Sequence, residues 1–227
     1  MPLELRPLVR ALGLRRSSLG GASAYVGRAG AREIAAAITG IGTRAAARAA
    51  ERLFEAFAFE RALVVGIAGG VAPGAALGEL IVPEFVLDAA SGRTYQPAQL
   101  AGFAARGTLR TSDEFVCEPD ALARFAAQGV IALDMETSAI AKVCERFGRP
   151  WSVLRAVSDM AGETPREVLA LAGPNGAGDF AALARYLAPA PWRALGLARL
   201  ARDSMRAAQT AATAAALACN AGTPERH

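Results

Sequence analysis

Acidic residues follow two short apolar stretches near the middle of the chain. Val130–Leu133 is an apolar run that Asp134 and Glu136 follow, and Trp151–Val157 is a second run that Asp159 follows. Continuous apolar runs of this length predict buried strands. Ligands bind at the carboxyl ends of strands in open α/β sheets, so we expect these carboxyl groups to lie at one site. Such groups can transfer protons or accept hydrogen bonds from hydroxyls.

The same acidic residues also have a purely structural explanation. Asp134 suits the cap of the helix that follows it, and Ser158 with Asp159 suits a turn after a strand. Each residue taken singly is therefore ambiguous. The case for a functional site depends on the residues acting as a group.

The remaining elements follow from apolar periodicity and from breaking residues. We expect helices at 43–57, 120–128 and 135–147, and strands at 23–28, 33–39, 62–67 and 80–88. Residues 92–105 are polar and contain proline, which predicts an irregular connection. A further helix start is indicated by Thr164, Pro165 and Glu167.

Length and composition indicate a folded protein. The 227 residues are 53% hydrophobic and 20% charged, which suits one domain with a substantial core and argues against disorder. The most apolar stretch, Leu63–Leu77, is interrupted by glycines and Pro73, so no spanning helix is predicted. The N-terminus has no basic segment followed by an apolar one, and we therefore expect a cytoplasmic protein.

Several classes of function are disfavoured by residues that are scarce. The sole histidine is His227, so neither a Ser-His-Asp or Cys-His mechanism nor a histidine-ligated metal is expected. Cys117, Cys144 and Cys219 have no paired spacing, which gives no sign of a zinc site or disulfide framework. The net charge of +4 is spread along the chain without interleaved aromatic residues, so no nucleic-acid partner is predicted.

Longer segments carry a resemblance to a known family. ALDMETSAIAKVC and SVLRAVSDMAGE, with TGIGTRAAARAAERLF and VVGIAGGVAPGAALGELIVPE upstream, extend over most of residues 23–163. The pattern resembles the purine nucleoside phosphorylase and methylthioadenosine/S-adenosylhomocysteine nucleosidase superfamily. The resemblance implies a single three-layer α/β domain over residues 1–217, in which helices flank a mixed, twisted sheet. We expect residues 218–227 to form a disordered tail.

The resemblance also implies a reaction, the cleavage of the N-glycosidic bond of an adenine nucleoside. Asp159 would protonate the leaving purine, Glu4 would activate water, and Glu136 would bind the ribose hydroxyls. The other substrate-binding residues that it implies are Met135, Phe115, Val116, Ser158, Ile67, Gly69 and Gly70. No metal or organic cofactor is implied, although phosphate is an alternative co-substrate. Glu4 and Phe115 also have plainer explanations, as a first-turn acid and a core aromatic.

Two departures from the family pattern leave the nucleophile open. Ile67 stands where nucleosidases usually carry Ser or Thr, and Val65 stands where many phosphorylases carry Arg. A further departure concerns the N-terminus, because only three residues precede Glu4 and the family's first strand has no sequence to form it. We expect either that the natural protein starts upstream or that its sheet is one strand short.

The C-terminal region has a different resemblance. Beyond Gly173 the sequence looks like the tail of the hopanoid-associated phosphorylases, which act on adenosylhopane. An apolar helix face would then serve a lipid-like substrate or a membrane surface, or would pack on the core. The residues of this face are Trp192, Leu195, Leu200 and Met205, flanked by Arg193, Arg199, Arg202 and Arg206.

Three functions therefore remain open from the sequence. The protein could release adenine from adenosylhopane, or hydrolyse methylthioadenosine, S-adenosylhomocysteine or futalosine. It could also bind a nucleoside without catalysis, because a fold does not determine a function. In each case we expect the partner to be a small molecule, which for an enzyme is a nucleoside substrate. We also expect the protein to form a homodimer or a higher homo-oligomer.

Overall fold

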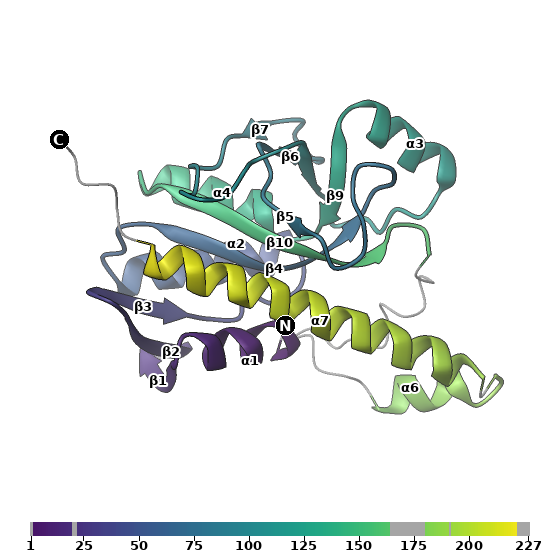
Figure 1. The fold of residues 1–227 in the computed structure, drawn as a ribbon, viewed down its shortest axis with the longest axis horizontal. Coiled ribbons are helices and arrows are strands. Elements are labelled where there is room, and N and C mark those ends of the chain that lie inside the picture. The colour runs from purple at the N-terminus through teal and green to yellow at the C-terminus, as the bar shows by residue number, and fades with distance from the viewer. Residues whose placement is uncertain (1, 20–21, 164–179, 191, 222–227) are drawn as a thin grey trace.

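The structure, a computed structural model, describes residues 2–19, 22–163, 180–190 and 192–221. Its centre is a mixed seven-stranded sheet with the order β5-β10-β4-β9-β8-β6-β7. Helices lie on both faces of this sheet (Figure 1), so the predicted three-layer α/β fold is confirmed. The strands of this sheet are β4 (Ala62–Gly70), β5 (Leu80–Ile81), β6 (Phe85–Asp88), β7 (Thr94–Tyr95), β8 (Thr108–Thr111), β9 (Val130–Asp134) and β10 (Trp151–Met160).

The strand register brings three carboxyl ends together. Strands β10 and β4 run parallel, and their pairing extends to Met160 opposite Gly70. Strand β9 runs antiparallel to β4, with Gly69 opposite Leu133. Asp134 and Asp159, at the ends of β9 and β10, therefore reach the same region as Glu136, although β4 separates the two strands.

Helices α2 (Thr43–Ala56) and α4 (Thr137–Arg146) pack against each other on one face of the sheet. The long helix α7 (Arg193–Asn220) crosses the opposite face over β10 and β4, and α1 (Pro2–Ala11) lies beside it (Figure 1). The α7 residues buried in this contact are all alanines, whose small side chains let the helix approach the sheet closely. They are Ala207, Ala208, Ala211, Ala212, Ala214 and Ala215.

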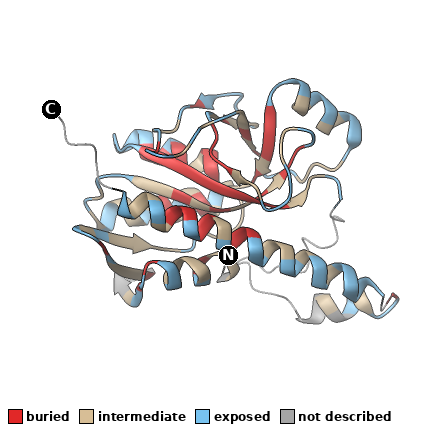
Figure 2. Cartoon of the chain, in the orientation of Figure 1, coloured by how far each residue is buried: buried red, intermediate tan, exposed pale blue. Residues whose placement is uncertain are grey.

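Burial is greatest in the centre of the large sheet. Strand β10 is buried from Trp151 to Ser158, and α7 changes from buried in its second half to largely exposed in its first half (Figure 2). Trp192, just before α7, and Leu195 are 73% and 70% exposed. In the described part of the chain no helix is long and apolar enough to cross a membrane.

A second, three-stranded antiparallel sheet consists of β1 (Arg15–Leu19), β2 (Ala22–Ala29) and β3 (Arg32–Ala36). The turn between β2 and β3 contains Gly30, which has a φ of 60° that side-chain-bearing residues rarely adopt. Strand β1 was not predicted from the sequence. Its residues, RRSSL, lack the apolar alternation that indicates a strand.

Several predicted boundaries differ from the structure. The expected strand at 80–88 is two strands, because Pro83 lies between β5 and β6 and has no N–H to donate to a ladder. The irregular connection at 92–105 contains the short strand β7. Helix α7 extends to Asn220, so residues 218–220, which were expected to be disordered, are helical. The helix start at Thr164 lies outside the described residues. The other helices are α3 (Pro119–Ala127) and α6 (Phe180–Leu187).

Candidate active site

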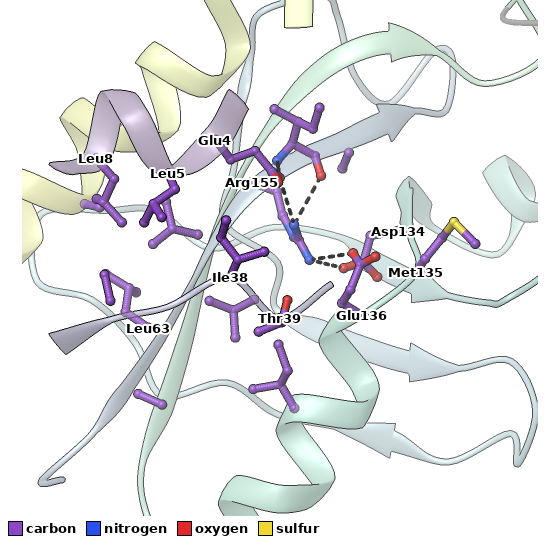
Figure 3. Close-up of a pocket in the computed structure, with 18 of the residues that line it drawn as sticks. Glu4, Leu5, Leu8, Ile38, Thr39, Leu63, Asp134, Met135, Glu136 and Arg155 are labelled. Atoms are coloured by element: carbon purple, nitrogen blue, oxygen red, sulfur yellow. Dashed lines mark hydrogen bonds and ion pairs between the residues drawn. The ribbon is translucent and has the colours of Figure 1, made fainter. Parts of the chain in front are cut away.

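A buried arginine on β10, Arg155, lies at the centre of the polar residues and is 4% exposed. Its Nη2 donates to Asp134 Oδ2 at 2.5 Å and to Thr137 Oγ1 at 3.0 Å. The same nitrogen lies 3.4 Å from Glu136 Oε2 (Figure 3). Arg155 thus joins β10 to the two carboxylates at the end of β9.

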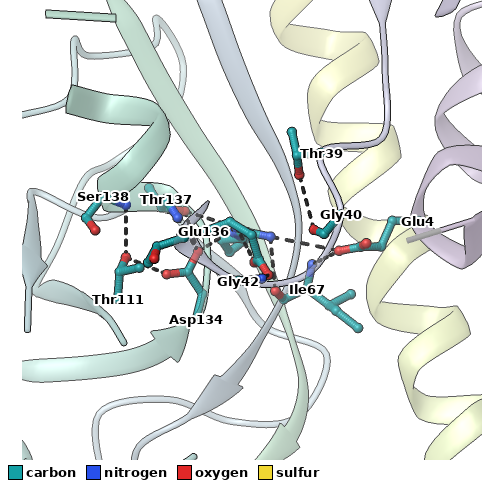
Figure 4. Close-up of polar contacts among 12 residues, drawn as sticks. Glu4, Thr39, Gly40, Gly42, Ile67, Thr111, Asp134, Glu136, Thr137 and Ser138 are labelled. Atoms are coloured by element: carbon teal, nitrogen blue, oxygen red, sulfur yellow. Dashed lines mark hydrogen bonds and ion pairs between the residues drawn. The ribbon is translucent and has the colours of Figure 1, made fainter. Parts of the chain in front are cut away.

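The other side of the Arg155 guanidinium faces the N-terminal helix. Its Nη1 donates to the carbonyl oxygen of Ile67 at 3.3 Å and lies 3.8 Å from Glu4 Oε1. Glu4 Oε1 also accepts a hydrogen bond from the Ile67 N–H at 3.0 Å (Figure 4). Helix α1 therefore brings a carboxylate from the start of the chain to the middle of β4.

Gly66 makes this arrangement possible. A Cβ atom at that position would overlap both the Arg155 guanidinium and the Glu4 carboxylate. The space that a side chain would occupy on β4 is thus filled by the ion pair. This explains in physical terms why the first glycine of the GIAGG segment must lack a side chain.

Three carboxylates face a single guanidinium in this cluster. Burial acts to lower the pKa of Arg155, but Asp134, Glu136 and Glu4 outweigh it, so that the pKa is raised. Burial raises the pKa of Glu136, and the neighbouring Asp134 and Glu4 carboxylates add to this effect. Arg155 and the Gly42 N–H partly offset the shift by stabilising the ionised form of Glu136.

Asp134 has the structural role that its position after a strand allowed. Its Oδ2 accepts hydrogen bonds from both the N–H and the hydroxyl of Thr137, at the first turn of α4. Its Oδ1 accepts from Thr111 Oγ1 at 2.6 Å, and Thr111 Oγ1 accepts from the Ser138 N–H (Figure 4). Asp134 is therefore a helix cap and the main counter-ion of Arg155.

A loop between β3 and α2 is held next to these residues by side-chain carboxylates. The Gly42 N–H donates to Glu136 Oε1 at 3.1 Å. The Thr43 N–H donates to Asp113 Oδ1 at 2.7 Å, and the Thr43 hydroxyl donates to Asp113 Oδ2 at 2.5 Å. Asp113 therefore fixes the first turn of α2.

A cavity of about 600 Å³ lies against this cluster. Nine of the ten residues predicted for the site line it, namely Glu4, Ile67, Gly69, Phe115, Val116, Met135, Glu136, Ser158 and Asp159. The tenth residue, Gly70, does not line the cavity. A Cβ atom at Gly70 would lie 2.8 Å from Val157 Cγ1 and 3.0 Å from Met160 Sδ. The structure therefore gathers the predicted residues, while their roles in binding and catalysis stay predictions.

Asp159 lies at the end of β10, just past a register shift between Val157 and Asp159. Its Oδ1 accepts a hydrogen bond from the Ser158 hydroxyl at 2.6 Å. Ser158 is 4% exposed, so its hydroxyl gives the carboxyl group a fixed partner on the protein side. The carboxyl group of Asp159 borders the cavity.

Arg155 is the site residue that sequence reasoning missed. It lies within the apolar strand sequence WSVLRAVSD, where arginine is unusual because a buried charge must be paired. An arginine within an otherwise apolar strand sequence was therefore the signal that could have identified this residue. Its partners come from residues 4, 134 and 136, so the sequence could not show which carboxylates would meet it.

The comparison with protein families decides the classification. A profile of the phosphorylase superfamily matches residues 1–104 and 99–187. The chain belongs to the phosphorylase superfamily. The family predicted from the sequence, and with it an enzyme, is thereby confirmed.

Among superfamily members, the chain is similar to two nucleosidases. It is 30% identical over 175 residues to the 5′-methylthioadenosine/S-adenosylhomocysteine nucleosidase of Aeromonas salmonicida, a match covering 64% of this chain and 76% of that protein. It is 28% identical over 204 residues to the enzyme of the same name from Tolumonas auensis, covering 75% and 89%.

Solved structures of the superfamily have the same fold. The nucleosidase of the same name from S. pneumoniae, with a transition-state inhibitor, superposes with a TM-score of 0.73 at 20% identity, covering 97% of this chain and 95% of that one. The futalosine hydrolase of Helicobacter pylori gives 0.72 at 19% identity, covering 96% and 93%. At these identities the likeness shows the fold alone.

Proposed function

We propose that the protein cleaves the N-glycosidic bond of an adenine nucleoside, with water as the nucleophile. The observation that carries the proposal is the position of Glu4. Its carboxylate borders the cavity, accepts a hydrogen bond from the Ile67 N–H and lies beside Arg155, while Asp159 borders the same cavity. A base and an acid on one cavity are what hydrolysis at C1′ requires. The names of the curated relatives support the same reaction.

In the proposed reaction the bond between C1′ and the purine nitrogen breaks and its electron pair passes to the base. Asp159, in its protonated form, donates a proton or a hydrogen bond to a ring nitrogen. The oxygen of water adds to C1′, and Glu4 accepts a proton from that water. Arg155 transfers no proton but holds the Glu4 carboxylate in place.

The sugar would be held by the residues that follow β9. Glu136 accepts hydrogen bonds from the ribose hydroxyls, and Met135 packs below the ring. Both residues border the cavity. Glu136 already accepts hydrogen bonds from Arg155 Nη2 and from the Gly42 N–H, and the second of these couples substrate binding to the loop before α2.

Charge favours water over phosphate as the nucleophile. Asp134, Glu136 and Glu4 place three carboxylates around the single guanidinium of Arg155. Even with Glu136 protonated, two carboxylates would remain against one cation. A phosphate dianion in that place would be repelled in a partly desolvated site.

The apolar part of the cavity favours an apolar 5′ substituent. Beyond the polar cluster the cavity is bordered by aliphatic and aromatic side chains of α1, α2, β4 and α7 (Figure 3). They include Leu5, Leu8, Phe54, Leu63 and Ala215. A methylthio group would fit such a lining. The extent of the lining also favours a second candidate, adenosylhopane, which the C-terminal resemblance implied.

The exposed start of α7 supports a peripheral contact with an anionic membrane surface. Trp192 and Leu195 are exposed, and four arginines flank them along the helix, Arg193, Arg199, Arg202 and Arg206. Apolar side chains beside basic ones bind such surfaces. Co-sedimentation with anionic vesicles tests this contact.

The oligomeric state is a separate prediction, and light scattering tests the expected homodimer. A cytoplasmic location and the lack of a cofactor stay predictions.

Release of the purine base from a panel of nucleosides tests the function. The panel contains methylthioadenosine, S-adenosylhomocysteine, futalosine and adenosylhopane, each with and without phosphate. Release of the free base from at least one adenine nucleoside without phosphate is expected. Binding without turnover would instead identify a nucleoside-binding protein.

A further inference from the structure

Arg110, like Arg155, borders the cavity, but it has no role in the proposed reaction. Arg110 lies on β8, opposite Leu133 of β9, and both residues line the cavity. Its neighbours Leu109 and Thr111 are fully buried, and the Thr111 hydroxyl faces Asp134 and Ser138. Side chains alternate along a strand, so Arg110 points to the opposite face of the sheet.

The Arg110 guanidinium is fixed in position but incompletely hydrogen-bonded. Its Cζ lies 4.4 Å from the centroid of the Phe125 ring, on α3. Its Nη1 is buried and, within the described part of the chain, has no hydrogen-bond partner. Buried donors are nearly always paired, so an unpaired one beside a cavity indicates an acceptor supplied by a ligand.

The chain after Asp159 extends to the same helix. A Cβ at Gly162 would lie 3.0 Å from Leu122 Cδ1, on α3. Helix α3 therefore contacts the segment that follows Asp159, and it also carries the Phe125 ring against which Arg110 lies. Phe115 and Val116, which also line the cavity, connect β8 to that helix. Arg110 and the segment that follows Asp159 therefore both contact α3.

The charge of Arg110 suits a departing base. Burial lowers the pKa of Arg110, and the nearby Glu114 carboxylate opposes this effect. A guanidinium remains protonated in proteins and can only donate hydrogen bonds. An acceptor is therefore required on the ligand, and ring nitrogens of a purine provide one.

We propose that Arg110 donates a hydrogen bond to N1 or N3 of the leaving base and stabilises the negative charge that develops on the ring. The inference rests on the proposed function and extends it to a second residue for the leaving group. As the bond to C1′ breaks, its electron pair moves onto the base, Asp159 supplies the proton, and Arg110 keeps its own protons. Preorganised donors of this kind act most strongly where charge develops.

Binding of free adenine tests the proposal without turnover. Isothermal titration should give a Kd that is about tenfold or more higher for Arg110→Met than for the wild type, since a charge-assisted hydrogen bond is lost. Arg124→Met is the matched control, because Arg124 is exposed on the same helix as Phe125, and its Kd should not change. Equal affinity of Arg110→Met and the wild type for adenine would overturn the proposal.

Deazapurines locate the acceptor. If Arg110 bonds a ring nitrogen, then either 1-deazaadenine or 3-deazaadenine should bind the wild type and Arg110→Met equally. The other analogue should still discriminate between the two proteins. Discrimination by both analogues as strong as with adenine would contradict a bond to either nitrogen.

Kinetics separate this proposal from the function on which it rests. With an adenine nucleoside, kcat/KM should fall about tenfold or more in Arg110→Met, mostly through kcat, and stay unchanged in Arg124→Met. If the wild type cleaves no nucleoside, the proposed function fails while the adenine titration still decides the role of Arg110. Thermal melts verify that each variant is folded. If Arg110→Met does not fold, Arg110→Lys replaces it. A loss of adenine affinity is still expected in Arg110→Lys, because lysine lacks the planar fork of the guanidinium.

Discussion

Among single residues, the proposed site is built around a buried charge cluster. Arg155 is almost wholly buried and its partners come from α1, β9 and the turn before α4. Removing so many charged groups from water is costly, so the cluster adds little net stability to the fold. Its more useful consequence is that Glu4 and Glu136 are held beside the cavity in fixed positions.

Arg155→Met should lower the free energy of unfolding by about 3 to 5 kcal/mol, because it leaves buried carboxylates without their counter-ion. Urea titration measures the change. The matched control is Arg146→Met, whose pair with Glu51 is exposed and should contribute at most about 1 kcal/mol. Equal losses in the two variants would show that the cluster is not the desolvated network described.

Glu136 should make stability depend on pH in a defined direction. The pKa of Glu136 is raised in the folded protein. In the pH window between the ordinary pKa of a glutamate and this raised pKa, the folded state therefore binds more protons than the unfolded state. The free energy of unfolding must then fall as pH rises through this window, and the loss is complete above it. Glutamine resembles the protonated side chain and removes this dependence.

Melting curves at several pH values test that direction. Glu136→Gln should melt no lower than the wild type above the window, and its advantage should shrink as pH falls toward the ordinary carboxyl value. Glu55→Gln, at an exposed position of α2, controls for the change in net charge. An advantage for Glu136→Gln that grows as pH falls would contradict the assignment.

At the scale of elements, the sequence predicted what depends on local pattern. The helices at α2, α3 and α4 and the strands β4, β9 and β10 follow from apolar periodicity and breakers, so their existence was predicted correctly. Strand β1 was missed because its stability comes from pairing with β2 and not from its own residues. The meeting of Glu4 with Ile67 joins residues 63 positions apart, which no local pattern encodes.

Gly66 on β4 tests this long-range packing. Gly66→Ala should lower both activity and melting temperature, since its Cβ would displace Arg155 or Glu4. Gly196→Ala in α7 is the matched control, because nothing lies within 4 Å of its Cβ position and alanine favours helix by about 1 kcal/mol. A Gly66→Ala protein as active and as stable as the control would show that the ion pair does not need this space.

At the scale of the whole molecule, the site is assembled from both ends and the middle of the chain. Helix α1 supplies Glu4, the strand ends supply Glu136 and Asp159, and α7 closes the apolar part of the cavity. The fold therefore places the proposed base, the proposed acid and an apolar lining around one cavity. The central claim is that these groups hydrolyse an adenine nucleoside.

Product analysis without phosphate tests this hydrolysis. The wild type should release adenine together with a free sugar and no sugar 1-phosphate, and Asp159→Asn should do so at least about a hundredfold more slowly. Thermal melts establish that the variant is folded. Adenine release that requires phosphate and gives a sugar 1-phosphate would contradict water as the nucleophile, and no adenine from any nucleoside of the panel would contradict the function itself.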